Sequence, residues 1–112
     1  MAIGDRIPTE LVAPTALNNT ATAVFTNSGA SYRTQITQIY LCNTGSSQRT
    51  VTLYKNGTAA VNQIANSIIL PANTSSIIDT KLVCTAAQAL AAKQDTGTDV
   101  NIAAYGIVEQ IA

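Results

Sequence analysis

The chain has 112 residues, enough for one domain that buries roughly two-thirds of the surface of its unfolded chain. Six basic and six acidic residues give a formal net charge of zero, and the six cations are scattered, which argues against a nucleic-acid partner because phosphate contacts need clustered Lys and Arg. Histidine, the usual general base near neutral pH, is absent. The six carboxylates lie in turns, in the N-terminal segment or beside surface strand positions, so we do not expect a catalytic carboxylate pair.

The low charge points to association with other proteins. Charged residues make up 11% of the chain, and a protein with no net charge lacks the repulsion that keeps soluble molecules apart. Small and polar residues suit a surface that packs against neighbours with little desolvation of charge. A poorly charged β protein without a partner is the alternative. Residues 1–9 lack an apolar run and no stretch reaches the ~20 apolar residues of a membrane span, so we expect synthesis in the cytoplasm and no membrane contact.

Residues 1–18 show no sustained hydrophobic period and contain Pro8 and Pro14. We predict an extended N-terminal arm that crosses to a neighbouring subunit, with a frayed terminus as the alternative. A sandwich domain is expected to occupy residues 19–112.

The first predicted strands follow that arm. A short strand is expected from residue 21 to 26, before the turn signal of Asn27 to Gly29. The next segment, Tyr32 to Asn43, is predicted to be a central strand because Ile39 and Leu41 share one face.

Residues 49–55 alternate between apolar and polar side chains, with Val51 and Leu53 inward and Tyr54 outward, as in a half-buried antiparallel strand. The dipeptide Asn56-Gly57 is typical of a two-residue hairpin turn, so the next strand is expected to fold straight back. A further strand is predicted for residues 67–70, before the turn at Pro71.

Three elements are predicted in the last third of the chain. Ser75 to Cys84 reads as a strand, Thr85 to Lys93 as a short helix because it is rich in alanine, and Val100 to Ile111 as a closing strand. About seven short strands separated by frequent turns predict an all-β fold, an antiparallel β-sandwich or jelly roll.

No catalytic, cofactor-binding or metal-ligating residue is predicted. Asp95 and Asp99 flank Gly97, but a calcium loop needs more acidic ligands, so we interpret this segment as a turn. Cys42 and Cys84 could in principle be bonded, yet free thiols are expected in a cytoplasmic product. Two cysteines without histidine do not make a structural zinc site.

The candidate functional residues are contacts rather than catalysts. Tyrosines at a subunit contact are expected, with stacking on a sugar as the alternative. The predicted core contains Ile39, Leu41, Val51, Leu53, Ile78, Leu82, Val100 and Ile102. The predicted interface residues are Arg6, Ile7, Leu11, Val12, Leu17, Tyr54 and Tyr105.

Three segments resemble small structural proteins of tailed bacteriophages. They are TQIYLCNTGSSQRTVTL, SIILPANTSSIIDTKLV and VNIAAYGIVEQI, and the similarity spans about residues 32 to 112. The resemblance implies a non-enzymatic β-sandwich of the virion, most often a capsid decoration or cement subunit that packs across capsomers. The alternative is a module of a tail or fibre that binds host-surface carbohydrate or another tail protein.

The resemblance also implies the partners. These would be the major capsid protein or other virion proteins, together with further copies of the chain itself. A homotrimer is favoured by analogy with decoration proteins on threefold positions. The expected location is the virion.

Overall fold

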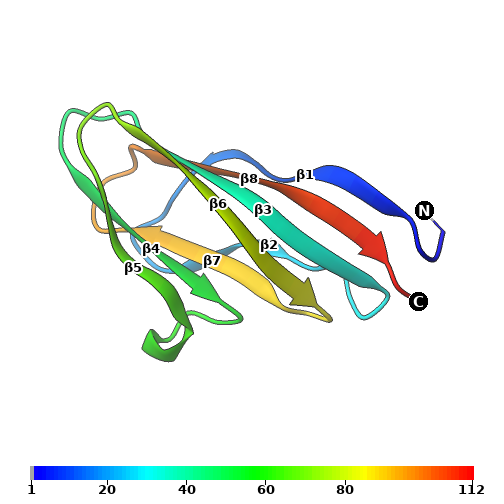
Figure 1. The fold of residues 1–112 in the computed structure, drawn as a ribbon. Coiled ribbons are helices and arrows are strands. Elements are labelled where there is room, and N and C mark those ends of the chain that lie inside the picture. The colour runs from blue at the N-terminus through cyan, green and yellow to red at the C-terminus, as the bar shows by residue number, and fades with distance from the viewer. Residues whose placement is uncertain (1) are drawn as a thin grey trace.

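The computed structural model describes residues 2–112 as an all-β sandwich of two four-stranded antiparallel sheets (Figure 1). Sheet A has the strand order β1-β8-β3-β6 and sheet B the order β2-β7-β4-β5. Among the described strands, only β4 and β5 are consecutive within one sheet, and every other connection crosses to the opposite sheet. This is the jelly-roll arrangement that the sequence analysis offered. The strands are β1 (Arg6–Ala16), β2 (Thr22–Thr26), β3 (Tyr32–Asn43), β4 (Arg49–Lys55), β5 (Gln63–Leu70), β6 (Ser75–Thr85), β7 (Ala89–Gln94) and β8 (Val100–Gln110).

The N-terminal segment differs from the predicted arm. It forms β1, an edge strand of sheet A that pairs with β8 from Arg6 opposite Glu109 to Ala16 opposite Asn101. Register shifts between Glu10 and Thr15 break the alternation of side chains, so the sequence of this strand has no regular period. Proline is tolerated here because the outward N–H groups of an edge strand need no partner. Residues 6–16 of the predicted arm therefore form a strand of the sandwich instead of lying outside it.

The predicted helix at residues 85–93 is wrong. The chain turns at Ala86, where φ is +51°, and then forms β7 between β2 and β4. Leu90, Ala91 and Ala92 are all buried. Pairing with two neighbouring strands and burial on both faces outweigh the helix propensity of alanine, which is a weak preference. With β1 and β7 added and residues 63–70 forming the single strand β5, the structure has eight strands where about seven were predicted.

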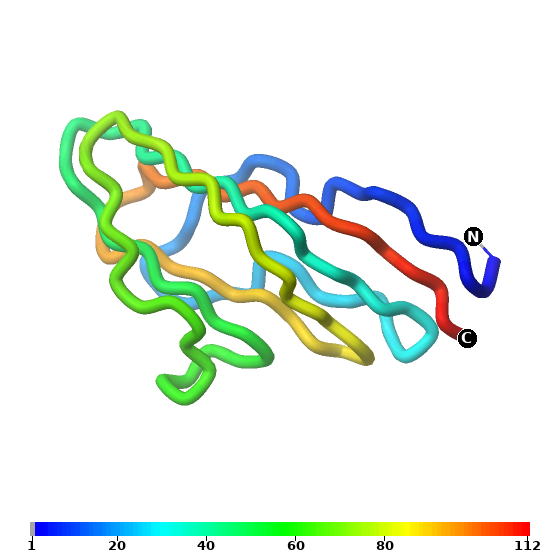
Figure 2. The backbone as a smooth tube through the Cα atoms, in the orientation of Figure 1, coloured from blue at the N-terminus to red at the C-terminus, as the bar shows by residue number. Residues whose placement is uncertain are grey.

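The connection from β4 to β5 confirms the direction of the chain but not the predicted two-residue turn. β5 returns antiparallel to β4 after a longer loop that contains a 3₁₀ turn, η1 (Ala60–Asn62). Asn56 adopts a φ of +64°, as a turn residue there was expected to do. Asn62 closes the loop, because its Nδ2 donates to the Lys55 carbonyl over 3.1 Å and its Oδ1 accepts from the Ala59 N–H over 3.2 Å. In Figure 2 this loop projects beyond the body of the sandwich.

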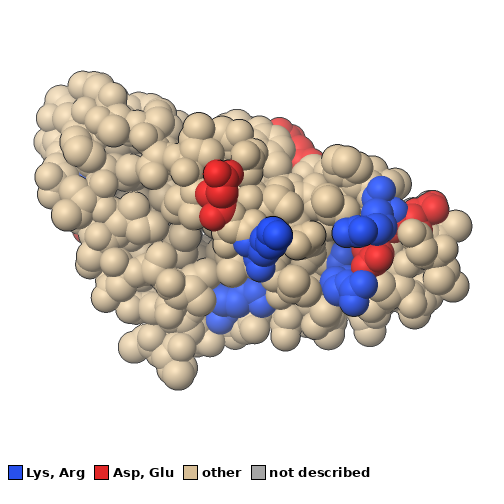
Figure 3. All heavy atoms as spheres, viewed as in Figure 1, with Lys and Arg blue, Asp and Glu red and all other residues tan. Residues whose placement is uncertain are grey.

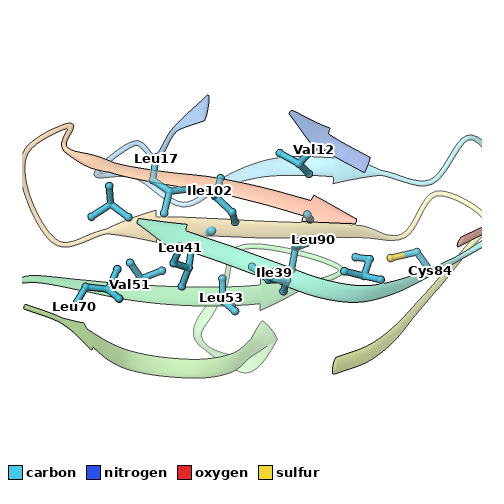
Figure 4. Packing of buried hydrophobic residues seen from close by; sticks show 14 residues of the cluster. Val12, Leu17, Ile39, Leu41, Val51, Leu53, Leu70, Cys84, Leu90 and Ile102 are labelled. Carbon is cyan, nitrogen blue, oxygen red and sulfur yellow. The ribbon is translucent and has the colours of Figure 1, made fainter. Parts of the chain in front are cut away.

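The core lies between the two sheets and contains the predicted residues (Figure 4). Ile39, Leu41 and Ile102 are each 1% exposed, while Ile78 and Leu82 are partly buried against this cluster. Residues from segments that the sequence analysis had left out of the core complete it, among them Leu17 and Leu90. Cys84 points into this core, whereas Cys42 lies half-buried on β3, and both are free thiols.

Two buried asparagines hold neighbouring loops in place through side-chain hydrogen bonds to their backbone. The amide of Asn43 donates to the carbonyls of Ser47, Leu70 and Pro71 and its Oδ1 accepts from the Gly45 N–H. Asn27 bonds in the same way to loop and turn backbone and accepts the hydroxyl of Thr34. Loop carbonyls that are buried lose their hydrogen bonds to water, and the amide groups of these two asparagines take the place of that water.

Candidate interaction surface

The outer face of sheet A, the side that points away from sheet B, carries three shallow hollows. They are lined mainly by β1, β3 and β8, with one residue from β6. Side chains on this face alternate with the core residues of the same strands, as the pleat of a sheet requires. Outward residues that line the hollows include Arg6, Pro8, Pro14, Arg33, Tyr40, Tyr105, Ile107 and Glu109.

The first hollow, of about 340 Å³, holds a small charge cluster. Arg33 donates from Nε to Glu109 over 2.9 Å and also bonds to it through Nη2, while the Arg6 Nε lies 3.7 Å from the other carboxylate oxygen. Two guanidinium groups thus share one carboxylate and leave one positive charge in excess. Since guanidinium groups bind carboxylates through charge-assisted hydrogen bonds, this end of the face is suited to an acidic group of a partner.

The other two hollows meet at Tyr105 and are largely apolar. One, of about 470 Å³, is lined by Tyr40, Tyr105 and Pro14 among others, and the next, of about 460 Å³, includes Pro8. The two tyrosine rings pack edge to face, with centroids 5.5 Å apart and an interplanar angle of 88°. The Tyr40 hydroxyl donates to Gln38 Oε1 over 3.0 Å. Half-buried aromatic rings with bonded polar tips are typical of the anchoring residues at protein contacts.

Charged side chains are sparse on the face of the molecule seen in Figure 3, where most of the surface is uncharged. Basic and acidic groups meet at the end where Figure 1 shows both termini. The opposite end of this view is almost free of charge. The low charge of this face agrees with the low charge of the composition.

The predicted interface residues separate into two groups. Arg6 and Tyr105 line the hollows, and Ile7 is 45% exposed at the start of β1. Val12 and Leu17 lie in the core at 5% and 2% exposure, and Leu11 packs against it, because β1 and the residue after it pair with β8.

Tyr54, also predicted to lie at an interface, is buried as well, but on the other sheet. Its side chain points away from the core, as expected from the alternation of β4, but it is only 3% exposed opposite Ala91 of β7. It is not available to a partner.

Several residues of this surface were missed by sequence reasoning. Alternation along residues 32–43 puts Tyr40 on the face opposite Ile39 and Leu41, which was a usable signal. Its proximity to Tyr105 could not be inferred, since it depends on the register that sets Gln38 of β3 opposite Tyr105. The cluster of Arg6, Arg33 and Glu109 likewise depends on β1 lying beside β8.

Asp95 caps backbone N–H groups, one of them in its own turn, and Asp99 binds an arginine that the sequence did not indicate. Asp95 Oδ1 accepts from the N–H groups of Thr50 and Thr96, and Asp99 Oδ1 accepts from Arg49 Nε over 2.8 Å. The hydrogen bond from Arg49 lowers the pKa of Asp99 below its ordinary value. Burial raises the pKa of the Cys84 thiol, against a smaller opposing effect of Lys55.

Within residues 2–112, no three His, Cys, Asp or Glu side chains come together as a metal site would require. No helix in the same part of the chain is both long and apolar enough to cross a membrane.

Comparison with known proteins gives matches only at the level of fold. No family model and no curated protein sequence matches this chain. A solved structure of Bacillus endospore appendages, described as disulfide-linked pili, matches with a TM-score of 0.57, 12% identity and coverage of 99% of this chain and 93% of that chain. The capsid of the Helicobacter pylori bacteriophage KHP30 matches with a TM-score of 0.54, 8% identity and coverage of 96% and 95%. The coat protein of Tobacco streak virus, solved as a dimer, matches with a TM-score of 0.53, 11% identity and coverage of 96% and 86%.

These similarities show that this chain shares its jelly roll with capsid, coat and appendage proteins. At identities this low the shared fold does not indicate a function, so function has to be inferred from the surface and its chemistry.

Proposed function

We propose that this chain is a non-enzymatic structural subunit of a bacteriophage virion, and that it decorates the head by packing the outer face of sheet A across capsomers of the major capsid protein. The observation that carries the proposal is the chemistry of that face, where two apolar hollows adjoin one small charge cluster. The resemblance of residues 32 to 112 to small phage structural proteins supports the same assignment.

The arrangement fits a contact with protein better than one with a small substrate. Tyr40, Tyr105 and the two prolines provide rigid apolar area, which loses little conformational entropy when a partner covers it. The surplus positive charge beside Arg6 would orient the partner protein on this face. Complementary charges across an interface determine the register of the two proteins more than they raise the affinity. The neighbours in fold are named for capsids, coats and appendages, which are assemblies of many copies.

The test is rebinding to phage heads stripped of this protein. Wild-type chain should saturate the heads at a copy number that matches capsid symmetry, measured by sedimentation. Tyr105→Ala should weaken rebinding at least about tenfold, because central aromatic residues dominate such contacts. Ile69→Ala is the matched control, since Ile69 is an exposed apolar residue of β5 in sheet B. Equal rebinding by Tyr105→Ala and wild type would contradict the use of this face.

A tail or fibre module that binds host-surface carbohydrate is the second candidate. It is favoured by the hollow at Tyr40 and Tyr105, where aromatic rings lie beside the polar side chain of Asn101. Tyr54 does not contribute to such a site, because it is buried in sheet B. Binding on a glycan array that is lost in Tyr40→Ala, together with failure to bind heads, would favour this function over decoration.

A further inference from the structure

β6 is one of the two edge strands of sheet A, and nothing in the described part of the chain pairs with its outer side. It pairs with β3 on one side only, over nine residue positions from Arg33 opposite Thr85 to Cys42 opposite Ser75. Its other side presents main-chain donors and acceptors, as any edge strand does. A strand with this property is a template for another strand.

The other three edges are less suited to pairing. β1 contains Pro8 and Pro14, which remove donors, and its ladder is interrupted twice. β2 has five residues. β5 is broken at Ser67, whose φ is +60°. β6 has 11 residues, and its ladder with β3 is interrupted once, between Asp79 and Leu82, where β6 has one residue more than β3. It is the longest of the four edge strands with neither a proline nor a positive φ.

The side chains of β6 alternate along its whole length. The odd-numbered residues from Ser75 to Val83 are exposed and the even-numbered ones are buried or half-buried. Ile77 and Val83 are exposed by 59% and 45%, which is high for large apolar residues on a strand. Between them lie Asp79 and Lys81, also exposed, and neither forms an ion pair within residues 2–112.

The sequence of this edge is complementary to itself when reversed about Thr80. In an antiparallel pair centred there, Asp79 would lie opposite Lys81 of the second copy, and Ile77 opposite Val83. The half-buried Ile78 would likewise lie opposite Leu82. In this register the outward-facing side chains of the two strands lie opposite one another, and so do the inward-facing ones, as the pleat of a sheet requires.

We propose that β6 pairs with β6 of a second copy of this chain, antiparallel and about a twofold axis at Thr80. The pairing would join two four-stranded sheets A into one continuous sheet. Two symmetry-related ion pairs between Asp79 and Lys81 fix the register, and contacts of Ile77 with Val83 flank them on both sides. A contact of this kind is isologous and closes after two subunits.

Charge complementarity favours this register over its neighbours. It also favours a second copy of the chain as the strand that pairs with β6. Moving the axis to Asp79 would set that carboxylate opposite itself, and moving it to Lys81 would set the ammonium group opposite itself. Like charges directly opposite each other destabilise a ladder. A strand of unrelated sequence would have no reason to carry the reversed order of charge and apolar residues, whereas a second β6 carries it by identity.

The proposal does not rest on head decoration, because it predicts a dimer of the free protein. It assigns a twofold contact where the sequence analysis favoured a trimer. Light scattering distinguishes the two, since the dimer has twice the 11.6 kDa mass of the chain. Failure to bind heads would leave the dimer intact, and a monomer in solution would leave the question of head binding open.

The first experiment is charge reversal, followed by sedimentation equilibrium over a range of concentrations. Asp79→Lys and Lys81→Asp each place like charges opposite one another twice, so each should raise the dimer dissociation constant by about tenfold or more. The double variant Asp79→Lys with Lys81→Asp restores opposite charges across the axis and should recover most of the loss. Circular dichroism of each variant confirms folding. Wild type that stays monomeric, or a dimer indifferent to all three variants, would overturn the proposal.

The second experiment locates the axis by crosslinking in a Cys42→Ser background. Thr80→Cys should form an intermolecular disulfide under mild oxidation, because the two positions face each other. Ser75→Cys is the matched control: its symmetry mate lies about 33 Å away, at roughly 3.3 Å per residue over ten residues. It should not crosslink with itself but should crosslink with Thr85→Cys in a mixture. Self-crosslinking by Ser75→Cys, or none by Thr80→Cys, would place the contact elsewhere.

Discussion

Arg49 Nε donates to Asp99 Oδ1 over 2.8 Å and ties the first residue of β4 to the loop that precedes β8. Both side chains are partly shielded, with 18% and 23% of their surfaces exposed. The close approach depends on Gly45, because a Cβ at that position would lie 1.9 Å from Asp99 Oδ2. This contact joins the two sheets at the end of the sandwich far from the chain termini (Figure 1).

The lowered pKa of Asp99 predicts acid sensitivity. A carboxyl whose pKa is lower in the folded than in the unfolded chain stabilises the fold above the unfolded value of about 3.9. That contribution is lost as the pH falls through the lower folded value. Urea unfolding midpoints measured from pH 6 to pH 2.5 should therefore fall less steeply for Asp99→Asn than for wild type. Arg49→Ala, which keeps the Asp99 carboxyl but removes its donor, should flatten the profile in the same way. A wild-type profile for both variants would contradict the prediction.

Core packing gives the second prediction. Leu53→Ala should lower the free energy of unfolding by about 2 to 5 kcal/mol, because Leu53 is 2% exposed between the sheets and truncation leaves a cavity. Ile69→Ala, at a residue 61% exposed on β5, should change it by less than about 0.5 kcal/mol. Urea denaturation measures both. Similar losses for the two variants would contradict the assignment of the inner face.

The buried asparagines give the third prediction. Asn43→Ala removes three hydrogen bonds to the carbonyls of Ser47, Leu70 and Pro71, at a side chain that is 1% exposed. Leaving buried carbonyls without a donor should cost about 1 to 3 kcal/mol of unfolding free energy. Asn66→Ala, at an exposed residue of β5, should be nearly neutral. A thermal unfolding midpoint for Asn43→Ala equal to that of Asn66→Ala would show that water replaces the lost donor.

Regular alternation made β3 and β4 predictable from sequence, because their inward residues Ile39, Leu41, Val51 and Leu53 follow the period of a strand. β1 and β7 were missed for opposite reasons. The register shifts of β1 erase its period, and the alanines of β7 are buried on both faces, so no alternation exists to be seen. In both segments pairing with distant strands determines the structure, and local sequence carries little of that information.

The candidate surface was predictable only residue by residue. Arg6 and Tyr105 were identified, but the neighbours that give them a role, Glu109 and Tyr40, come from strands whose register is set by long-range pairing. Tyr54 shows that the orientation of a side chain does not by itself predict its exposure. Alternation correctly pointed its ring away from the core, yet orientation did not reveal that the outer side of sheet B buries it.

The register that builds this surface also depends on Gly106. At this point β3 contains an extra residue relative to β8, and the backbone of β3 approaches so closely that a Cβ on Gly106 would lie 2.0 Å from the Gln35 carbonyl oxygen. Gly106→Ala should cost about 1 to 3 kcal/mol, since a backbone atom must move to admit the methyl group.

Because Tyr105 is the next residue, the same shift should also change its ring packing against Tyr40. Two-dimensional NMR of the tyrosine ring protons should show altered shifts for both rings in Gly106→Ala, whereas Ile69→Ala, on the other sheet, should leave them unchanged. Ring shifts identical to wild type in Gly106→Ala, with unaltered stability, would show that the bulge yields without disturbing the outer face.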